Sequence, residues 1–239
     1  MKRASEKYRY IILYGVLTLI LGLSTGATAV AQEYKYEYGG MVGGSMYMGD
    51  ANPDALLRGW NPAGSLIFRR NFNFRWALKT GLLYGKVSGD TRNTENIFPG
   101  HAEVSFNRSV FELGGQMEFN FLPYSDKFAY LNTSRMTPYL LVGLGLTIAP
   151  GENKTFVGVN FPLGIGVKYK IVNRINLGLE YKVHRLFGDG FDAPNAEGFN
   201  LDNPYKIQSG LFKNKDWYNT LMISVTWDFG PNDRKCTNE

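Results

Sequence analysis

The sequence predicts an all-β protein: an eight-stranded antiparallel transmembrane β-barrel with long outer loops. Three observations predict this fold. The chain starts with an export signal, eight later segments alternate apolar and polar residues, and aromatic residues stand at the ends of the apolar faces. Barrel strands face lipid with every second side chain only, so they do not stand out in a hydropathy average. A mean hydropathy of −0.23 together with 15% aromatic residues fits such strands.

The first 31 residues have the layout of a secretory signal peptide. Four basic residues among the first nine precede an apolar run at 11–23, and the small-x-small site Ala29-Val30-Ala31 follows. The apolar run is shorter than the roughly 20 residues of a membrane-spanning helix, which makes a retained anchor the weaker alternative. We therefore predict a signal peptide at 1–31, an outer-membrane barrel at 32–230 and a periplasmic tail at 231–239.

The charge of the exported chain is small. The whole sequence has a formal net charge of +5, and the signal segment carries four basic residues and one acidic residue. The exported chain is therefore left with +2. Nucleic-acid binding requires a concentrated basic face, so this balance gives it no support.

Period-two alternation marks six segments clearly and two more weakly. In the clearest segment, Trp76 and Leu82 share one face, whereas Lys79 and Gly81 share the other. Eight is an even number, as a closed single-chain barrel requires. In chain order, the predicted strands cover residues 36–48, 63–70, 74–85, 111–121, 140–148, 161–169, 175–184 and 217–229.

A soluble β-sandwich would alternate as well, but two features favour the membrane barrel. The apolar faces begin and end in Trp, Tyr or Phe, as at membrane interfaces. The opposite faces carry ionisable residues among glycines. An eight-stranded barrel is only just wide enough for side chains, and buried charges need partners. We therefore expect the inward ionisable residues to pair and fill the barrel: Lys79, Glu112, Glu118, Glu180, Lys182 and His184.

Loop lengths predict the orientation. The connections at 71–73 and 172–174 are tight, whereas those after the first, third and seventh strands, at 49–61, 86–105 and 187–215, are long. Barrels of this kind place short turns in the periplasm and long loops outside, so both termini are expected in the periplasm. The segment Pro123 to Arg135 breaks the rule as a long periplasmic turn. Loops often carry function, which makes this turn a candidate site.

No catalytic, metal-binding or cofactor-binding residues are predicted. Two distant histidines and a single cysteine are too few for a zinc site. The one conceivable acyl-transfer pair is His184 with Ser224 on the next strand, and pairing inside the barrel explains His184 more simply. The glycines at 39, 40, 43 and 44 lack the strand–turn–helix setting of a phosphate-binding loop and suit a tightly curved first strand instead.

Cys236 lies on the predicted periplasmic tail. A single cysteine in an exported chain indicates either an intermolecular disulfide or a free thiol. The periplasm is oxidising, so Cys236 is the candidate for an intermolecular disulfide. An idle thiol is the alternative.

Short motifs in a consistent order carry a resemblance to a known family. They are YGG at 38–40, YMGDANP at 47–53, NFRWALK at 73–79, GDT at 89–91, EFNFLPY at 118–124, TPY at 137–139 and NKDWY at 214–218, with Cys236 near the end. Through them the mature chain resembles the PorG family, small outer-membrane barrels of the type IX secretion and gliding machinery of the Bacteroidota. The resemblance implies a scaffold, not an enzyme, that ties a periplasmic ring of the lipoprotein PorK and its partner PorN to the outer membrane.

We therefore expect an outer-membrane anchor that contacts lipid and binds PorK-like and PorN-like subunits through its periplasmic face. Two alternatives remain: a lipid-modifying enzyme using His184 and Ser224, or a small pore or adhesin acting through its outer loops. The loop at 187–215 could also plug the barrel. The residues expected to bind the partner are Tyr124, Asp126, Lys127, Tyr130, Arg135 and Cys236.

Overall fold

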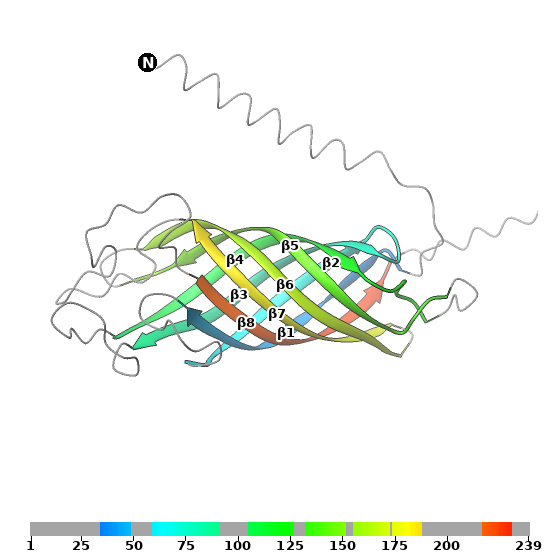
Figure 1. Ribbon diagram of the computed structural model, residues 1–239, viewed down its shortest axis with the longest axis horizontal. Coiled ribbons are helices and arrows are strands. Elements are labelled where there is room, and N and C mark those ends of the chain that lie inside the picture. The colour runs from blue at the N-terminus through cyan, green and yellow to red at the C-terminus, as the bar shows by residue number, and fades with distance from the viewer. Residues whose placement is uncertain are drawn as a thin grey trace, which may run out of the picture.

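The computed structural model describes residues 34–48, 59–90, 105–126, 132–151, 155–172, 174–187 and 217–230. Eight strands close into one antiparallel barrel, in chain order around the circumference, and the first strand pairs with the last (Figure 1). The predicted fold class is confirmed. Within the described residues, no helix is long and apolar enough to cross a membrane. The strands are β1 (Tyr36–Met48), β2 (Asn61–Asn71), β3 (Trp76–Asp90), β4 (Ser105–Asn120), β5 (Met136–Ala149), β6 (Phe156–Val172), β7 (Ile175–Phe187) and β8 (Trp217–Phe229).

The predicted bounds of β1 and β8 are correct, whereas the loop predicted at 86–105 is wrong at both of its ends. β3 continues to Asp90 and pairs with β4 as far as Ser105. The reason is a reversal of the pattern in this part of the barrel. Val87 is completely buried inside, while Lys86 is exposed outside. The apolar outer face therefore ends before the strand does, and the alternation that marks a lipid-facing strand is lost.

The outer surface of the barrel is an apolar band. Along β6, the outward residues from Val157 to Tyr169 are all apolar or aromatic and exposed. A band of this extent on a water-soluble protein would be an aggregation site, and on a barrel it is the lipid-facing surface. Aromatic side chains bound the band at both ends. At the end with the short turns they include Tyr38, Phe68, Trp76, Phe121 and Trp227, and at the other end Trp60, Tyr84, Phe111 and Phe187.

The interior of the barrel is layered. At the end with the long loops, buried apolar side chains form one cluster: Tyr47, Val87, Val110, Ala149, Phe156, Leu186 and Tyr218. A second apolar cluster lines one side at mid-height and includes Met41, Leu83 and Met222. The half nearer the short turns is filled mainly by charged and amide side chains. The protein core is therefore inside the barrel, and its polar half lies next to the mouth at the turn end.

Candidate partner-binding site at the mouth of the barrel

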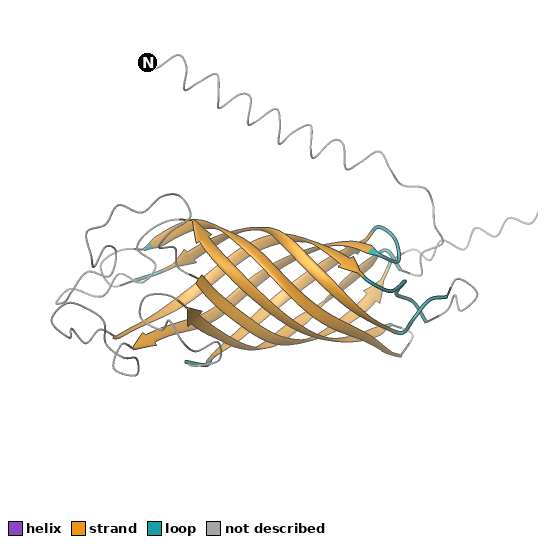
Figure 2. Cartoon of the chain, in the orientation of Figure 1, coloured by secondary structure: helices purple, strands orange, loops and turns teal. Residues whose placement is uncertain are grey.

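The two ends of the barrel differ in their connections. Residues 72–75 join β2 to β3 and residues 173–174 join β6 to β7, whereas 49–60, 91–104 and 188–216 connect strands at the opposite end. Barrels of this kind place short turns in the periplasm. We therefore assign the turn end, where β1 begins and β8 ends, to the periplasm. Most of the described loops and turns, drawn in teal, gather at one end of the barrel (Figure 2).

The long periplasmic turn at 121–135 has a fixed base. Tyr124 and Ser134 form an isolated bridge, beside which the Ser125 amide donates to the Ser134 carbonyl at 3.1 Å. The Ser134 amide donates to the Pro123 carbonyl at 2.8 Å. The Tyr124 amide donates to the carbonyl of Phe74, in the neighbouring short turn, at 3.2 Å. Both limbs of the long turn are thus tied to each other and to the rim of the barrel.

Tyr124 extends into the mouth of the barrel. Its hydroxyl donates to Asn176 Oδ1 at 2.7 Å, and the Lys168 and Lys170 ammonium groups lie 5.2 and 5.5 Å from its ring centroid. Ammonium groups at this range are attracted to the ring face. The side chain is half-buried, so only part of it is accessible from the periplasm. Burial raises the pKa of the Tyr124 phenol, and the nearby Glu37 and Asp228 carboxylates raise it further.

We expect Tyr124 to stay protonated at about pH 11, where ordinary tyrosines ionise. Absorbance titration at alkaline pH should therefore give the same number of ionising tyrosines in the folded wild type and in Tyr124→Phe. Because the pKa of Tyr124 is higher in the folded than in the unfolded chain, its contribution to the free energy of unfolding is complete below the ordinary tyrosine pKa of about 10. This contribution is lost as the pH rises from there towards the raised pKa. One ionising tyrosine fewer in Tyr124→Phe at about pH 11 would contradict the prediction.

The other residues expected to bind the partner are only partly described. Asp126 is half-buried on the same limb as Tyr124, and Arg135 is exposed on the opposite limb, directly before β5. The Tyr124–Ser134 bridge brings these two limbs together. Lys127, Tyr130 and Cys236 lie outside the described residues, as do the predicted signal peptide at 1–31, the tail at 231–239 and the loop at 187–215 beyond Phe187.

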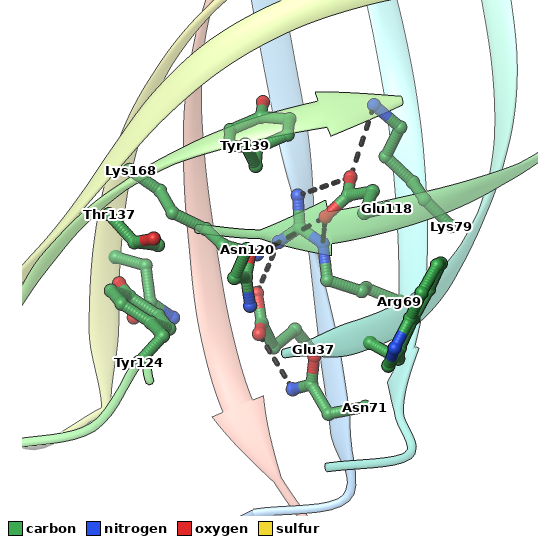
Figure 3. Close-up of polar contacts among 12 residues, drawn as sticks. Glu37, Arg69, Asn71, Lys79, Glu118, Asn120, Tyr124, Thr137, Tyr139 and Lys168 are labelled. Carbon is green, nitrogen blue, oxygen red and sulfur yellow. Dashed lines mark hydrogen bonds and ion pairs between the residues drawn. The ribbon is translucent and has the colours of Figure 1, made fainter. Parts of the chain in front are cut away.

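A network of ion pairs lies inside the barrel below the mouth (Figure 3). Glu118 is completely buried, and its carboxylate pairs with Arg69 Nε at 2.8 Å, Lys168 Nζ at 3.2 Å and Lys79 Nζ at 3.3 Å. Arg69 also pairs with Glu37, at the first inward position of β1. This network connects five strands, β1, β2, β3, β4 and β6, across the lumen, so it holds together the wall that carries the long turn.

The expected pairing of the inward ionisable residues is confirmed. Lys79 pairs with both Glu118 and Glu180, and Lys182 lies 3.4 Å from Glu180. Nearer the outer end, His184 Nδ1 lies 2.8 Å from Glu112 Oε2. Five further ion-paired residues were not named in that expectation, although period-two alternation places Lys168 and Asp228 on inward faces. They are Glu37, Arg69, Lys168, Lys170 and Asp228.

The structure does not bring Ser224 to His184. In the β7–β8 register, Ser224 is opposite Gly178 and His184 is opposite Tyr218. Six residues along a strand separate the two levels by roughly 20 Å. The His184 ring instead stacks on Tyr218, with centroids 4.3 Å apart, and its Nε2 contacts Thr220 Oγ1 at 3.3 Å. The geometry of an acyl-transfer pair is therefore not formed, because sharing an inward face does not place two residues at the same height.

A closed eight-stranded barrel with an apolar, aromatic-bounded exterior and an ion-paired interior defines an outer-membrane β-barrel protein. Its location is the outer membrane. The chain belongs to the family described as "Domain of unknown function (DUF6089)", whose profile matches residues 14–238. No curated protein matches the sequence.

Solved structures similar to this chain are small bacterial barrels. Neisserial surface protein A is 10% identical with a TM-score of 0.49, and the match covers 82% of this chain and 97% of that one. Ail, the attachment invasion locus protein of Yersinia pestis, solved with the heparin analogue sucrose octasulfate, is 11% identical with a TM-score of 0.43, covering 82% and 99%. The N-terminal β-barrel domain of Pseudomonas aeruginosa OprF is 10% identical with a TM-score of 0.41, also covering 82% and 99%. At these identities the likeness concerns the fold alone.

Proposed function

We propose that this protein is an outer-membrane anchor of a type IX secretion machinery and that its periplasmic face binds a ring of PorK-like and PorN-like subunits. The observation that carries the proposal is the long turn at 121–135, whose base is tied to the rim of the barrel. The motif resemblance to the PorG family supports it independently. Cys236 is the candidate for a disulfide to the bound subunit.

The attachment of the turn suits the transmission of force. Tyr124 is hydrogen-bonded to Phe74 through its amide and to Asn176 through its hydroxyl, so it links the turn to two separate parts of the barrel wall. A load applied by a partner at this turn passes into eight strands that are hydrogen-bonded around the whole circumference. The apolar outer band holds that cylinder in the bilayer, since moving it into water would expose the whole band.

Deleting the gene in its own bacterium is expected to leave type IX cargo proteins inside the cell. The reason is that the periplasmic ring would lose its attachment to the outer membrane. The measurement is the amount of cargo in the culture medium, together with recovery of the PorK-like subunit with the affinity-tagged barrel in complemented cells. Normal secretion in the deletion strain would refute the proposed function.

Complementation separates the turn from the rest of the barrel. A variant in which residues 126–133 are replaced by a short Gly-Asn linker should insert and fold, but should restore neither secretion nor recovery of the PorK-like subunit. Trp60→Ala, at the opposite end of the barrel, is the matched control and should restore both. Folding of each variant is read from the different gel mobilities of unheated and boiled samples.

A further inference from the structure

A basic residue stands directly before each strand that starts at the periplasmic end. Lys35 precedes β1, Arg75 precedes β3, Arg135 precedes β5 and Arg174 precedes β7. Strands that start at this end alternate with strands that finish there, so the four positions are spread around the whole rim. We call these four residues the basic collar.

Each collar residue stands one position before a strand, in line with the inward row of that strand. Successive side chains of a strand point to opposite faces, so each collar residue has the same parity as the residue two positions later. Those residues are all buried inside the barrel: Glu37, Ala77, Thr137 and Asn176. The outward-facing residues near this end include Arg70, by contrast. Its guanidinium lies 5.3 Å from the ring centroid of Phe72. The collar therefore encircles the opening and does not continue the lipid-facing row.

Contacts with the neighbouring segments hold two collar arginines along the rim. Arg75 Nη1 donates to the Phe121 carbonyl at 2.9 Å, in the turn after β4. Arg174 Nε donates to the Tyr34 hydroxyl at 3.2 Å, and its guanidinium lies 5.3 Å from the Tyr34 ring centroid. These contacts leave the guanidinium charge uncompensated, because a carbonyl, a hydroxyl and a ring face carry no negative charge.

The charge of the rim is one-sided. Arg75, Arg135 and Arg174 are exposed, and no described carboxylate forms an ion pair with any of the three. Among the described residues beyond the strand ends on this side, Asp126 is the only acidic one. Inside the barrel, by contrast, Lys79, Lys168 and Lys170 each pair with a carboxylate. The three arginines of the collar thus present positive charge to the periplasm that no carboxylate of the described barrel neutralises.

We propose that the basic collar binds an acidic protein surface that docks end-on over the periplasmic mouth. This inference rests on the proposed function and specifies the charge of the partner's contact surface. Charge complementarity steers association and excludes partners of the same sign. A phospholipid headgroup reaches the barrel from the side, next to the outward row that carries Arg70. An end-on acidic surface can contact all four sides of the rim at once.

The test uses the full-length barrel in nanodiscs of phosphatidylcholine, with poly-L-glutamate as the acidic probe. Arg135→Gln/Arg174→Gln should bind the probe about tenfold more weakly than the wild type, because two exposed charge contacts are lost. Lys86→Gln/Arg185→Gln removes the same charge at the outer end and should bind as the wild type does. Equal weakening in both variants, or wild-type affinity in the collar variant, would overturn the proposal.

A second measurement separates a protein surface from lipid. The same variants are purified from membranes containing phosphatidylglycerol, and the retained lipid is quantified by mass spectrometry. Loss of phosphatidylglycerol from the collar variant with unchanged probe binding would mean that the collar holds lipid, and the proposal would be wrong. The two proposals can fail separately. If the folded collar variant binds the probe normally while the deletion strain still fails to secrete, the collar proposal is wrong and the anchor function stands.

Discussion

Replacing Glu118 with glutamine is expected to lower the free energy of unfolding by about 3–5 kcal/mol. The Glu118 carboxylate is completely buried and lies within 3.3 Å of cationic nitrogens of Arg69, Lys79 and Lys168. Glutamine keeps the volume but removes the negative charge. Lys168 then has no described carboxylate within ion-pair distance, and buried cations without partners are the costly outcome of breaking such a network.

Urea unfolding in lipid vesicles, followed by tryptophan fluorescence, measures this loss. Gly115→Ala is the matched control on the same strand, since a Cβ added there meets no atom within 4 Å. The double variant Glu118→Gln/Lys168→Met should lose less stability than the sum of the two single changes, because it removes a cation together with its partner. The explanation would be untenable if Glu118→Gln unfolded at the same urea concentration as Gly115→Ala.

Replacing Gly43 with valine is expected to cost about 3 kcal/mol or more and to hinder closure of the barrel between β1 and β8. Gly43 is opposite Met222 in that seam. A Cβ at Gly43 would lie 2.1 Å from the Leu221 carbonyl oxygen and 2.7 Å from Met222 Cα. Both atoms belong to the backbone of β8 and cannot rotate aside, so the two strands would have to separate.

Barrel closure is measured after the protein is refolded into lipid vesicles. The measured quantity is the fraction of protein that stays folded in gel samples that are not heated. Gly40→Val is the matched control on the outward face of β1, where the closest atom to an added Cβ is the Ser65 carbonyl oxygen at 3.8 Å. That variant should fold as the wild type does. Equal folded shares for Gly43→Val and Gly40→Val would show that glycine is not required at the seam.

Much of the wall could be predicted, because each lipid-facing residue must be apolar whatever its neighbours are. Trp76 and Leu82 were assigned outward and Lys79 inward, and all three lie as predicted. The prediction failed beyond the membrane edge. There Val87 faces inward and Lys86 outward, because water has replaced lipid outside and the apolar cluster is inside. Local alternation cannot distinguish a strand end of this kind from a loop.

The candidate site was less predictable. The length and side of the turn at 121–135 followed from counting residues between strands. The inward placement of Tyr124 did not, since it depends on Asn176, 52 positions away in the chain. The collar was also missed, because its residues are isolated in the sequence and become neighbours only when four strands start at one rim.

By itself, the sequence determined that the chain forms a barrel of eight strands, which faces of the strands are apolar and which carry ionisable residues, and which end has the short turns. Those properties follow from period-two alternation and from the distances between strands, both of which are local. Only the tertiary structure decided which cation pairs with which carboxylate, that Ser224 and His184 lie at different heights, and that Tyr124 lies in the mouth. Strand register sets these relations, and the register is read from the pairing of each strand with both of its neighbours, including β1 with β8.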